Sequence, residues 1–521
     1  MLVKTYAGAV QGIEATTITV EVSAGGLPET DDKKTIFYFL VGLPDSAVKE
    51  GWQRIEAAMK NSKLTVPRVK LVVNLAPADL RKEGSSYDLP IAIGIYAAAN
   101  NLTLNDLDKF VMMGELSLDG SVRPIKGALP IAIQARHEKF RGLILPKANA
   151  REAAIVSDIE VYGIEHVREA IEFFQGKRQL ERVIVDTRAE FAAQHNTYDV
   201  DFSDVRGQEN IKRALEIAAA GGHNAILIGP PGAGKTMLAR RLPTILPPLN
   251  LYEALETTKI HSVSGILPPE ASLVATRPFR APHHTISDVA LVGGGSTPMP
   301  GEISLAHNGV LFLDELPEFK RTVLEVMRQP MEERRVTISR AKISTEYPAS
   351  FMLIASMNPC PCGYYNHPDK PCVCGAGIVK RYLNKISGPL LDRIDLHVEV
   401  TPVKLEELTA VTHNSETSAD IAARVVLARD IQAVRFEKTK GVYCNAQMPS
   451  RMVREVCQLD TEGIALLKTA MQRLQLSARA YDRILKVART AADLANSVDI
   501  KTEHLAEAIQ FRSLDRENWA G

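Results

Sequence analysis

A glycine-rich segment of eight residues constrains the fold of this 521-residue chain more than any other feature. It fits the pattern G-x-x-x-x-G-K-[ST], follows an apolar run at residues 224–228, and precedes a helical stretch that begins at Met237. A strand, loop and helix in this order turn backbone N–H groups toward phosphate oxygens. The pattern therefore predicts an α/β fold with a phosphate site formed by Gly229, Pro230, Pro231, Gly232, Ala233, Gly234, Lys235 and Thr236.

A second apolar run, at residues 309–313, ends in Asp314 and Glu315. After a glycine-rich phosphate loop, such a pair predicts ATP hydrolysis. We expect Lys235 to reach the β- and γ-phosphates, and Thr236 and Asp314 to hold Mg²⁺. Glu315 would then polarise the attacking water. Asn358 ends the next apolar run, where a polar side chain can orient that water.

The pattern of apolar residues divides the chain. Period-2 alternation around Ile18, Val20 and Val22 predicts a half-buried strand near the N-terminus. Short apolar runs in the middle of the chain alternate with helical stretches, which is typical of a buried parallel sheet. We expect an α/β domain at 1–175, a linker at 176–199, a nucleotide-binding core at 200–404 with a cysteine-rich insert at 360–375, and a helical region at 405–521.

Charge and hydropathy exclude several classes of protein. The chain carries 62 basic and 62 acidic residues, so any site for nucleic acid must be a local basic feature. The longest apolar stretch, at residues 89–99, is about half the roughly 20 residues that span a bilayer. The N-terminus also lacks the apolar segment of a secretory signal. We therefore expect a cytoplasmic protein without a membrane partner.

Four of the six cysteines lie close together in the insert. Four thiolates in so short a span can bind Zn²⁺ tetrahedrally, and the metal would supply folding energy to a polar segment. The predicted ligands are Cys360, Cys362, Cys372 and Cys374. Reduced thiols, a redox-labile cluster, and His367 as a replacement ligand remain alternatives. Cys444 and Cys457 are isolated, and we expect them to be packing residues.

Two β-branched runs flank residues 339–342 and predict a hairpin with a basic tip. Arg340 and Lys342 lie at this tip, where they would bind DNA phosphates despite the zero net charge. A solvated surface hairpin is the alternative. The loop at residues 277–302 contains His283 and His284, to which the sequence assigns no role.

The chain resembles the magnesium-chelatase-like ComM/YifB family of bacteria over nearly its full length. The phrases that carry the resemblance are RPFRAPHHT at 277–285, PGEISLAHNGVLFLDEL at 300–316 and SGPLLDRIDLHVEV at 387–400. The resemblance implies a P-loop AAA+ module with a helical lid, in which Asn358 is sensor 1. It also implies that Arg393 is the arginine finger and Arg479 is sensor 2, with Arg381 and Arg483 as their alternatives.

The first domain resembles the Lon-protease-like fold. In that register Ser86 occupies the nucleophile position, but the position of the catalytic lysine falls on Leu129, and Lys126 is three residues away. A serine–lysine dyad needs the lysine to take the serine proton. We therefore expect a proteolytically inactive domain, which makes an ATP-dependent protease a disfavoured function.

The family resemblance also implies a homo-hexameric ring, because an arginine finger acts across a subunit interface. ComM members are implicated in natural transformation as branch-migration helicases, and the hairpin resembles one that lines the pore of related helicases. We expect an ATP-driven hexameric DNA motor that acts on single-stranded or branched DNA in homologous recombination during natural transformation, with recombination proteins as possible partners. The alternative is an ATP-dependent remodeller of a protein or cofactor complex, as in magnesium chelatase.

Overall fold

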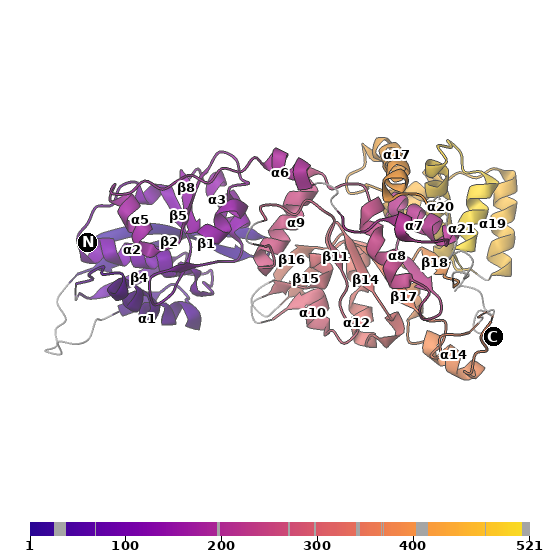
Figure 1. Cartoon of the computed structure of the whole chain (residues 1–521), viewed down its shortest axis with the longest axis horizontal. Helices are drawn as coiled ribbons and strands as arrows, with labels where there is room; N and C mark the ends of the chain where they lie inside the picture. Colours follow the sequence, from indigo (N-terminus) through magenta and orange to yellow (C-terminus); the bar gives the residue numbers. More distant parts are fainter. Residues whose placement is uncertain are drawn as a thin grey trace. The chain divides into compact units, whose positions relative to one another are not determined.

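The computed structural model divides into two compact units (Figure 1). The first comprises Met1–Gln194 and Leu251–Val274, and the second comprises His195–Asn250 and Ala275–Gly521. The residues that the structure describes are 1–25, 38–67, 69–194, 198–268, 271–295, 298–339, 344–365, 367, 369–402, 415–474 and 476–512.

The first unit is built on a mixed sheet with the strand order β3-β4-β2-β1-β5-β8-β9. Its strands are β1 (Leu2–Gln11), β2 (Glu14–Ala24), β3 (Tyr38–Val41), β4 (Leu71–Ala76), β5 (Phe110–Met112), β8 (Gly142–Pro146) and β9 (Glu160–Ile164), and β6 (Glu115–Leu116) pairs with β7 (Val122–Arg123). Its helices are α1 (Ser46–Asn61), α2 (Asp88–Ala99), α3 (Ala128–His137), α4 (Lys147–Ala153), α5 (Val167–Phe174), α6 (Thr187–Gln194) and α9 (Leu251–Ser264).

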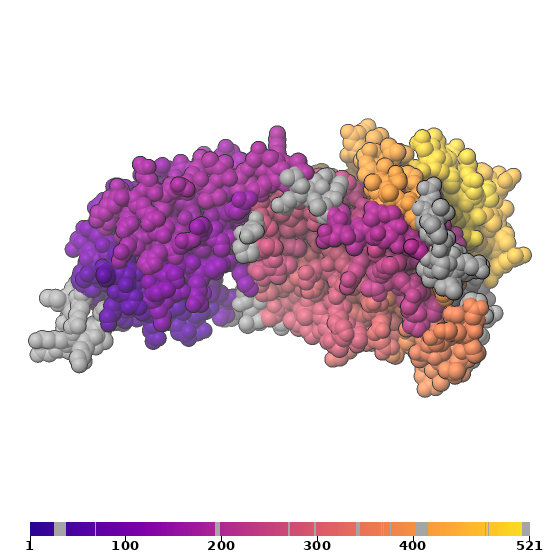
Figure 2. Space-filling model, in the orientation of Figure 1, coloured from indigo at the N-terminus to yellow at the C-terminus, as the bar shows by residue number. Residues whose placement is uncertain are grey.

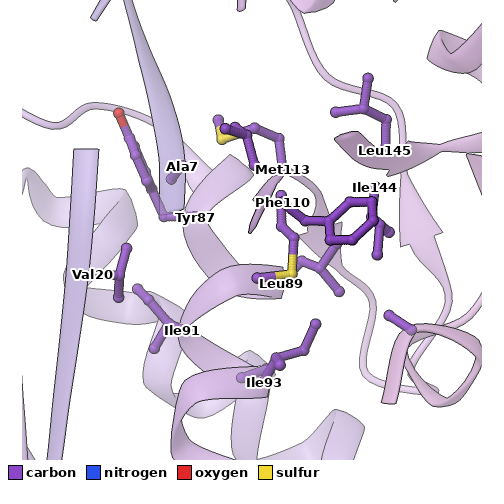
Figure 3. Packing of buried hydrophobic residues seen from close by; sticks show 14 of the residues in the cluster. Ala7, Val20, Tyr87, Leu89, Ile91, Ile93, Phe110, Met113, Ile144 and Leu145 are labelled. Atoms are coloured by element: carbon purple, nitrogen blue, oxygen red, sulfur yellow. The ribbon is translucent and has the colours of Figure 1, made fainter. Parts of the chain in front are cut away.

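Helix α2 forms the centre of this unit's core. Its residues are apolar on every side, which is the pattern of a helix that is buried all round. Gly94 allows the helix to approach β2, since a Cβ atom at this position would lie 2.7 Å from Val22 Cγ2. Figure 3 shows side chains of α2 next to residues of the sheet, such as Phe110 and Ile144. The predicted alternation is confirmed, because Ile18, Val20 and Val22 of β2 are all buried.

The boundaries of the first unit differ from those expected. Helix α9 lies in the sequence of the predicted nucleotide-binding core but packs on α3 of the first unit. The side chains of Ser262 on α9 and Glu152 on α4 are joined by a hydrogen bond. The expected linker at residues 176–199 includes α6, whose Glu190 pairs with Arg151 at 2.5 Å. Only tertiary contacts show that α9 and α6 belong to the first unit. The local sequence of α9 also fits the nucleotide-binding core, and that of α6 also fits a linker.

The second unit contains a five-stranded sheet with the order β11-β14-β17-β10-β18. Neighbouring strands are parallel throughout, as the apolar runs predicted, so the α/β fold class is confirmed. The strands are β10 (Ala225–Ile228), β11 (Phe279–Arg280), β14 (Val310–Leu313), β17 (Met352–Met357) and β18 (Leu396–Glu399). The shorter helices and strands around it are α7 (Glu209–Gly221), α8 (Lys235–Arg241), α10 (Asp288–Val292), β12 (Gly293–Gly294), β13 (Met299–Pro300), α11 (Glu302–Leu305), α12 (Arg321–Val326), α13 (Arg328–Glu333), β15 (Arg335–Ser339), β16 (Ser344–Pro348), α14 (Ala376–Leu383) and α15 (Gly388–Leu391).

The C-terminal helices cover α7. They are α17 (Ser418–Phe436), α18 (Ser450–Val456), α19 (Thr461–Arg473), α20 (Ala478–Leu494) and α21 (Thr502–Gln510). Helices α17 and α20 both pack on α7 and on each other, and Figure 2 shows the orange and yellow residues of this bundle side by side. None of the described helices is both long and apolar enough to cross a membrane.

A buried polar network joins the sheet to this helical bundle. His223, after α7, contacts Asp395 Oδ2 through Nδ1 at 2.9 Å and Thr490 Oγ1 through Nε2 at 2.9 Å. Arg483 of α20 forms an ion pair with the same carboxylate. Burial disfavours the charge on Asp395, but Arg483 and His223 hold its pKa well below its usual range. The negative charge of Asp395 is therefore stabilised by Arg483, a residue of the helical bundle.

Substitution of Asp395 by Ala should destabilise the second unit by about 3–5 kcal/mol, because it leaves the buried His223 and the half-buried Arg483 without their carboxylate partner. Pulse proteolysis in increasing urea measures this loss. The matched control is Asp392→Ala. This residue pairs with Arg479, whose side chain is 68 % exposed, so the expected loss is about 0–1 kcal/mol. Equal urea midpoints for the two variants would contradict the role assigned to the network.

Candidate functional site

The glycine-rich segment forms the loop between β10 and α8, as the sequence predicted. Gly232 and Gly234 have φ angles of +80° and +82°, which L-residues with a side chain rarely adopt. Gln208, at the start of α7, donates a hydrogen bond from Nε2 to Ala233 O at 2.9 Å. The loop is therefore fixed by its own backbone conformation and by a side chain from outside it.

Lys235 lies at the centre of the site with a buried ammonium group. Its Nζ atom donates to Gly229 O at 2.7 Å, to Pro230 O at 3.0 Å and to Asn358 Oδ1 at 3.0 Å. Burial lowers the pKa of Lys235 and outweighs the opposite effect of Asp314 and Glu315. The three oxygen acceptors compensate the cost of burying the charge. Phosphate oxygens of a nucleotide are chemically suited to take the place of these acceptors.

Asp314 and Thr236 meet at the end of the sheet. The Thr236 hydroxyl donates to Asp314 Oδ2 at 2.8 Å, and the Ser356 hydroxyl bonds to Oδ1 of the same carboxylate. Strand β14 pairs with β17 in a register that places Leu313 opposite Ala355, which brings the following residues together. A hydroxyl and a carboxylate oxygen at this position are ligands that Mg²⁺ prefers.

Glu315 follows Asp314 in a left-handed backbone conformation, with φ of +54°. Its side chain is 57 % exposed, and its Oε2 atom lies 3.6 Å from Nδ1 of His284. The rings of His283 and His284 lie with their centroids 4.1 Å apart and their planes tilted by 34°. The structure thus places a histidine next to the expected catalytic carboxylate. Strand β11 lies beside β14, so the residues that follow the two strands become neighbours.

Arg393 is held by residues of its own chain. Its Nη2 atom lies 2.5 Å from Glu332 Oε1, its Nη1 atom donates to Pro389 O at 2.6 Å, and its side chain is 11 % exposed. Its buried Nε atom has no hydrogen-bond partner among the described residues. The alternative finger, Arg381 in α14, is exposed.

The two candidates for sensor 2 occupy successive turns of α20. Arg483 pairs with buried Asp395 and belongs to the network that stabilises the lid. Arg479 pairs with Asp392 at 3.3 Å and is largely exposed. Because Arg483 already neutralises a buried carboxylate, Arg479 has the more accessible guanidinium group for a phosphate.

The predicted hairpin is present. Strands β15 and β16 are antiparallel, and Ser339 lies opposite Ser344. Val336 and Ile338 point into the protein, while Arg335, Thr337 and Ser339 are exposed. The tip residues Arg340 and Lys342 lie outside the described residues.

The four cysteines of the insert form a compact cluster. Their sulfur atoms all lie within 4.8 Å of one another, and the separations are 3.3 Å for Cys360–Cys362, 3.7 Å for Cys360–Cys372 and 3.6 Å for Cys362–Cys372. Zinc–sulfur bonds of about 2.3 Å in a tetrahedron separate the sulfur atoms by about 3.8 Å. The cluster therefore has the dimensions of a tetrathiolate metal centre.

The surroundings favour a thiolate at Cys362 but not at Cys372 and Cys374. Backbone hydrogen bonds lower the pKa values of the latter two thiols, but burial and the neighbouring thiols raise them overall. Burial raises the pKa of Cys362, but backbone N–H groups of Tyr364 and Val373 and the Cys360 thiol lower it to about 6. His367 is not part of the cluster, because its Nδ1 atom accepts from Asp369 N at 3.0 Å and Lys370 N at 3.1 Å. Cys444 and Cys457 are buried elsewhere, as expected for packing residues.

The residues of the predicted protease-like turn lie in the first unit. Ser86 is half-buried, and its carbonyl accepts from Gly114 N at 2.8 Å. Leu129 is fully buried in α3. Lys126 is exposed and packs against Gly265, where a Cβ atom would lie 2.7 Å from its Cε. The absence of a serine–lysine dyad stays a prediction that peptidase assays can check.

Three residues of the nucleotide site were not identified from the sequence: Gln208, His284 and Ser356. Ser356 did give a signal, since it is a polar residue in an otherwise apolar buried strand. His284 gave none, because its neighbour Glu315 is distant in sequence and the pairing of β11 with β14 alone brings them together.

Three family models match the chain and together cover most of it. Residues 201–408 match "Magnesium chelatase, subunit ChlI", residues 29–149 match "Subunit ChlI of Mg-chelatase", and residues 415–512 match the C-terminal part of that subunit. The first of these regions contains the phosphate-binding loop, Asp314, Glu315, Asn358 and Arg393, and the third contains Arg479 and Arg483.

Relatives match the chain over nearly its full length. The chain is 42 % identical to "Competence protein ComM" of Haemophilus influenzae, over 98 % of this chain and 97 % of the relative. It is 44 % identical to "Uncharacterized protein YifB" of Escherichia coli, over 97 % and 96 %. A weaker similarity, 27 % identity over 30 % of this chain, relates it to a magnesium-chelatase 38 kDa subunit of Rhodobacter capsulatus. With its P-loop, Asp-Glu pair and helical lid, the chain belongs to the ComM/YifB family of magnesium-chelatase-like AAA+ ATPases.

Proposed function

We propose that this protein is an ATP-driven, homo-hexameric DNA motor that moves branched or partly single-stranded DNA during recombination. Membership of an AAA+ ATPase family accounts for the ATP hydrolysis. The proposal goes beyond family membership in four points: the coupling to DNA, the hexameric ring, branch migration and a role in natural transformation. Recombination proteins are its expected partners, and the cytoplasm its expected compartment.

ATP hydrolysis is the part of the proposal that the structure supports best. The supporting observation is the set of hydrogen bonds that joins Lys235 to Asn358 and Thr236 to Asp314. These contacts hold a phosphate-binding ammonium group, a Mg²⁺ ligand pair and the polar end of β17 within one site. Glu315 follows Asp314 directly, and its side chain is 57 % exposed, so an attacking water could reach it. ATP and Mg²⁺ are therefore the proposed cofactors.

Two observations support DNA as the partner. The relative from Haemophilus influenzae is named a competence protein and matches nearly the whole chain. Between β15 and β16 the sequence contains Arg340 and Lys342, the basic residues predicted at the tip, in a chain whose net charge is zero. Six copies of this tip in a ring would neutralise DNA phosphates locally.

The family models favour a second function, because all three are named for subunits of magnesium chelatase. Under this alternative the protein would use ATP to remodel a protein or cofactor complex. A high rate of ATP hydrolysis that DNA does not change would support this alternative. We also propose Zn²⁺ as the metal of the four-cysteine cluster, since the sulfur separations fit a tetrahedral site.

Substitution of Arg393 by Ala should lower the rate of ATP hydrolysis by about 10³-fold or more, because an arginine finger stabilises the transition-state charge. The affinity for ATP should not change. Steady-state ATPase rates and the binding of a fluorescent ATP analogue measure the two quantities. Arg381→Ala is the matched control and should remain active.

A subunit-mixing test separates a finger from a structural residue. Arg393→Ala and Glu315→Gln subunits are each expected to be inactive alone. Mixed rings should regain partial activity, because an Arg393 supplied by one variant can act on the intact Glu315 of the other. Full turnover by Arg393→Ala alone, or no recovery in the mixture, would refute the role of Arg393.

The double variant Arg340→Ala/Lys342→Ala should lose the stimulation of ATP hydrolysis by DNA. ATPase rates with single-stranded, duplex and four-way-junction DNA at fixed salt measure this effect. The salt dependence of DNA affinity should become shallower by about one to two units of slope, since one phosphate contact accounts for about one unit. Arg335→Ala is the control, because Arg335 lies on the same hairpin but pairs with Glu333 and Glu346. Equal loss of stimulation in the control would contradict a role specific to the tip.

A further inference from the structure

The cysteine-rich insert lies directly against the phosphate-binding loop. Gly363, which follows Cys362, is buried and has a φ of +84°. A Cβ atom at this position would lie 2.5 Å from Pro231 Cδ and 3.2 Å from Pro231 Cγ. The backbone of the insert therefore approaches the ring of Pro231 as closely as a glycine allows.

The same insert begins shortly after Asn358, a residue of the nucleotide site. Cys360 comes two residues after Asn358, whose Oδ1 atom accepts from Lys235 at 3.0 Å. Cys360 is fully buried, and its carbonyl accepts from Gly363 N at 3.0 Å in a tight turn. One turn, at residues 360–363, therefore carries two of the four thiols and contacts Pro231 through Gly363. It follows Asn358 closely in the chain.

Among the described residues 361–375 of this insert, Gly363 alone is buried. Between Cys360 and α14 the described residues are mostly half-buried or exposed, and Val373 is 83 % exposed. A segment without a hydrophobic core of its own obtains its folding energy from a bound metal when suitable ligands are present. The position of Gly363 therefore depends on the four-cysteine cluster.

We propose that a zinc ion bound by the four-cysteine cluster positions the phosphate-binding loop for nucleotide, through the contact of Gly363 with Pro231. The metal takes no part in hydrolysis. It holds the turn of Cys360 and Cys362 in place, and the turn restricts the loop to its binding conformation. Loss of the metal lowers the fraction of molecules whose loop can bind, and the apparent dissociation constant rises in proportion. This inference rests on the proposed function, since it requires that the loop bind ATP.

The test measures metal content and nucleotide affinity separately on the full chain. Elemental analysis of protein purified without chelator should show about one zinc ion per chain, as four thiolates bind a single tetrahedral ion. Removal of the zinc with a chelator selective over Mg²⁺ should weaken the binding of a fluorescent ATP analogue by about tenfold, which corresponds to a competent fraction of about 0.1. Added Zn²⁺ should restore the affinity.

Two glycine variants provide a matched pair. Gly363→Ala pushes a Cβ atom into Pro231, whereas Gly375→Ala adds one where no atom lies within 4 Å, at a φ of −65°. We expect Gly363→Ala to bind ATP weakly while keeping its zinc, and Gly375→Ala to match the native protein in both measurements. In Pro231→Ala, which removes the ring that Gly363 contacts, extraction of zinc should change the affinity much less than in the native protein.

The outcomes separate this inference from the proposed function. Failure of the untreated, zinc-containing protein to bind ATP would overturn both. Normal ATP binding that is unaffected by zinc removal would overturn only the positioning role, as would an equal effect of zinc removal in Pro231→Ala and the native protein. A protein that neither contains zinc nor takes up added Zn²⁺ would overturn the inference at its first step.

Discussion

The buried ammonium group of Lys235 determines the geometry of the nucleotide site. A charge in this environment must be surrounded by acceptors, and the chain provides them from the phosphate-binding loop and from the end of β17. These hydrogen bonds connect two strands whose residues are more than a hundred positions apart. Lys235 thereby links the phosphate-binding loop to Asn358, two residues before the cysteine-rich insert begins.

The order of strands brings the remaining parts of the site to the same edge. Because β14, β17 and β10 are neighbouring parallel strands, the residues after each strand meet at one end of the sheet. In open α/β sheets this edge is the usual place for a ligand. Asp314 there receives hydrogen bonds from Thr236 and Ser356, which fix its carboxylate for a metal ion.

The helical lid is attached through charges rather than through apolar contacts alone. Asp392 and Asp395 flank Arg393, and each pairs with an arginine of α20. The segment with the proposed finger and the helix with the proposed sensor are therefore connected within one chain. Glu332, which precedes the hairpin, pairs with Arg393 itself. Three separate ion pairs thus hold the segment around Arg393 against α13 and α20.

Much of the nucleotide site was predictable because its signals are local. The glycines, Lys235 and Thr236 are consecutive, and Asp314, Glu315 and Asn358 each end an apolar run. The four cysteines also lie within one short segment. Ser356 and Gln208 were missed because their roles depend on which strand or loop lies beside them. His284 was missed for the same reason, since only the pairing of β11 with β14 places it near Glu315.

The sequence by itself determined the α/β class, the phosphate loop, the acidic pair, the hairpin and the cysteine cluster, because hydrophobic periodicity and residue spacing act over short stretches of chain. The tertiary structure alone decided that α9 packs with the first unit, that Arg483 serves the buried Asp395, and that Gly363 touches Pro231. Each of these depends on contacts between residues that are distant in sequence, and no local pattern of side chains encodes which distant surface a segment will meet.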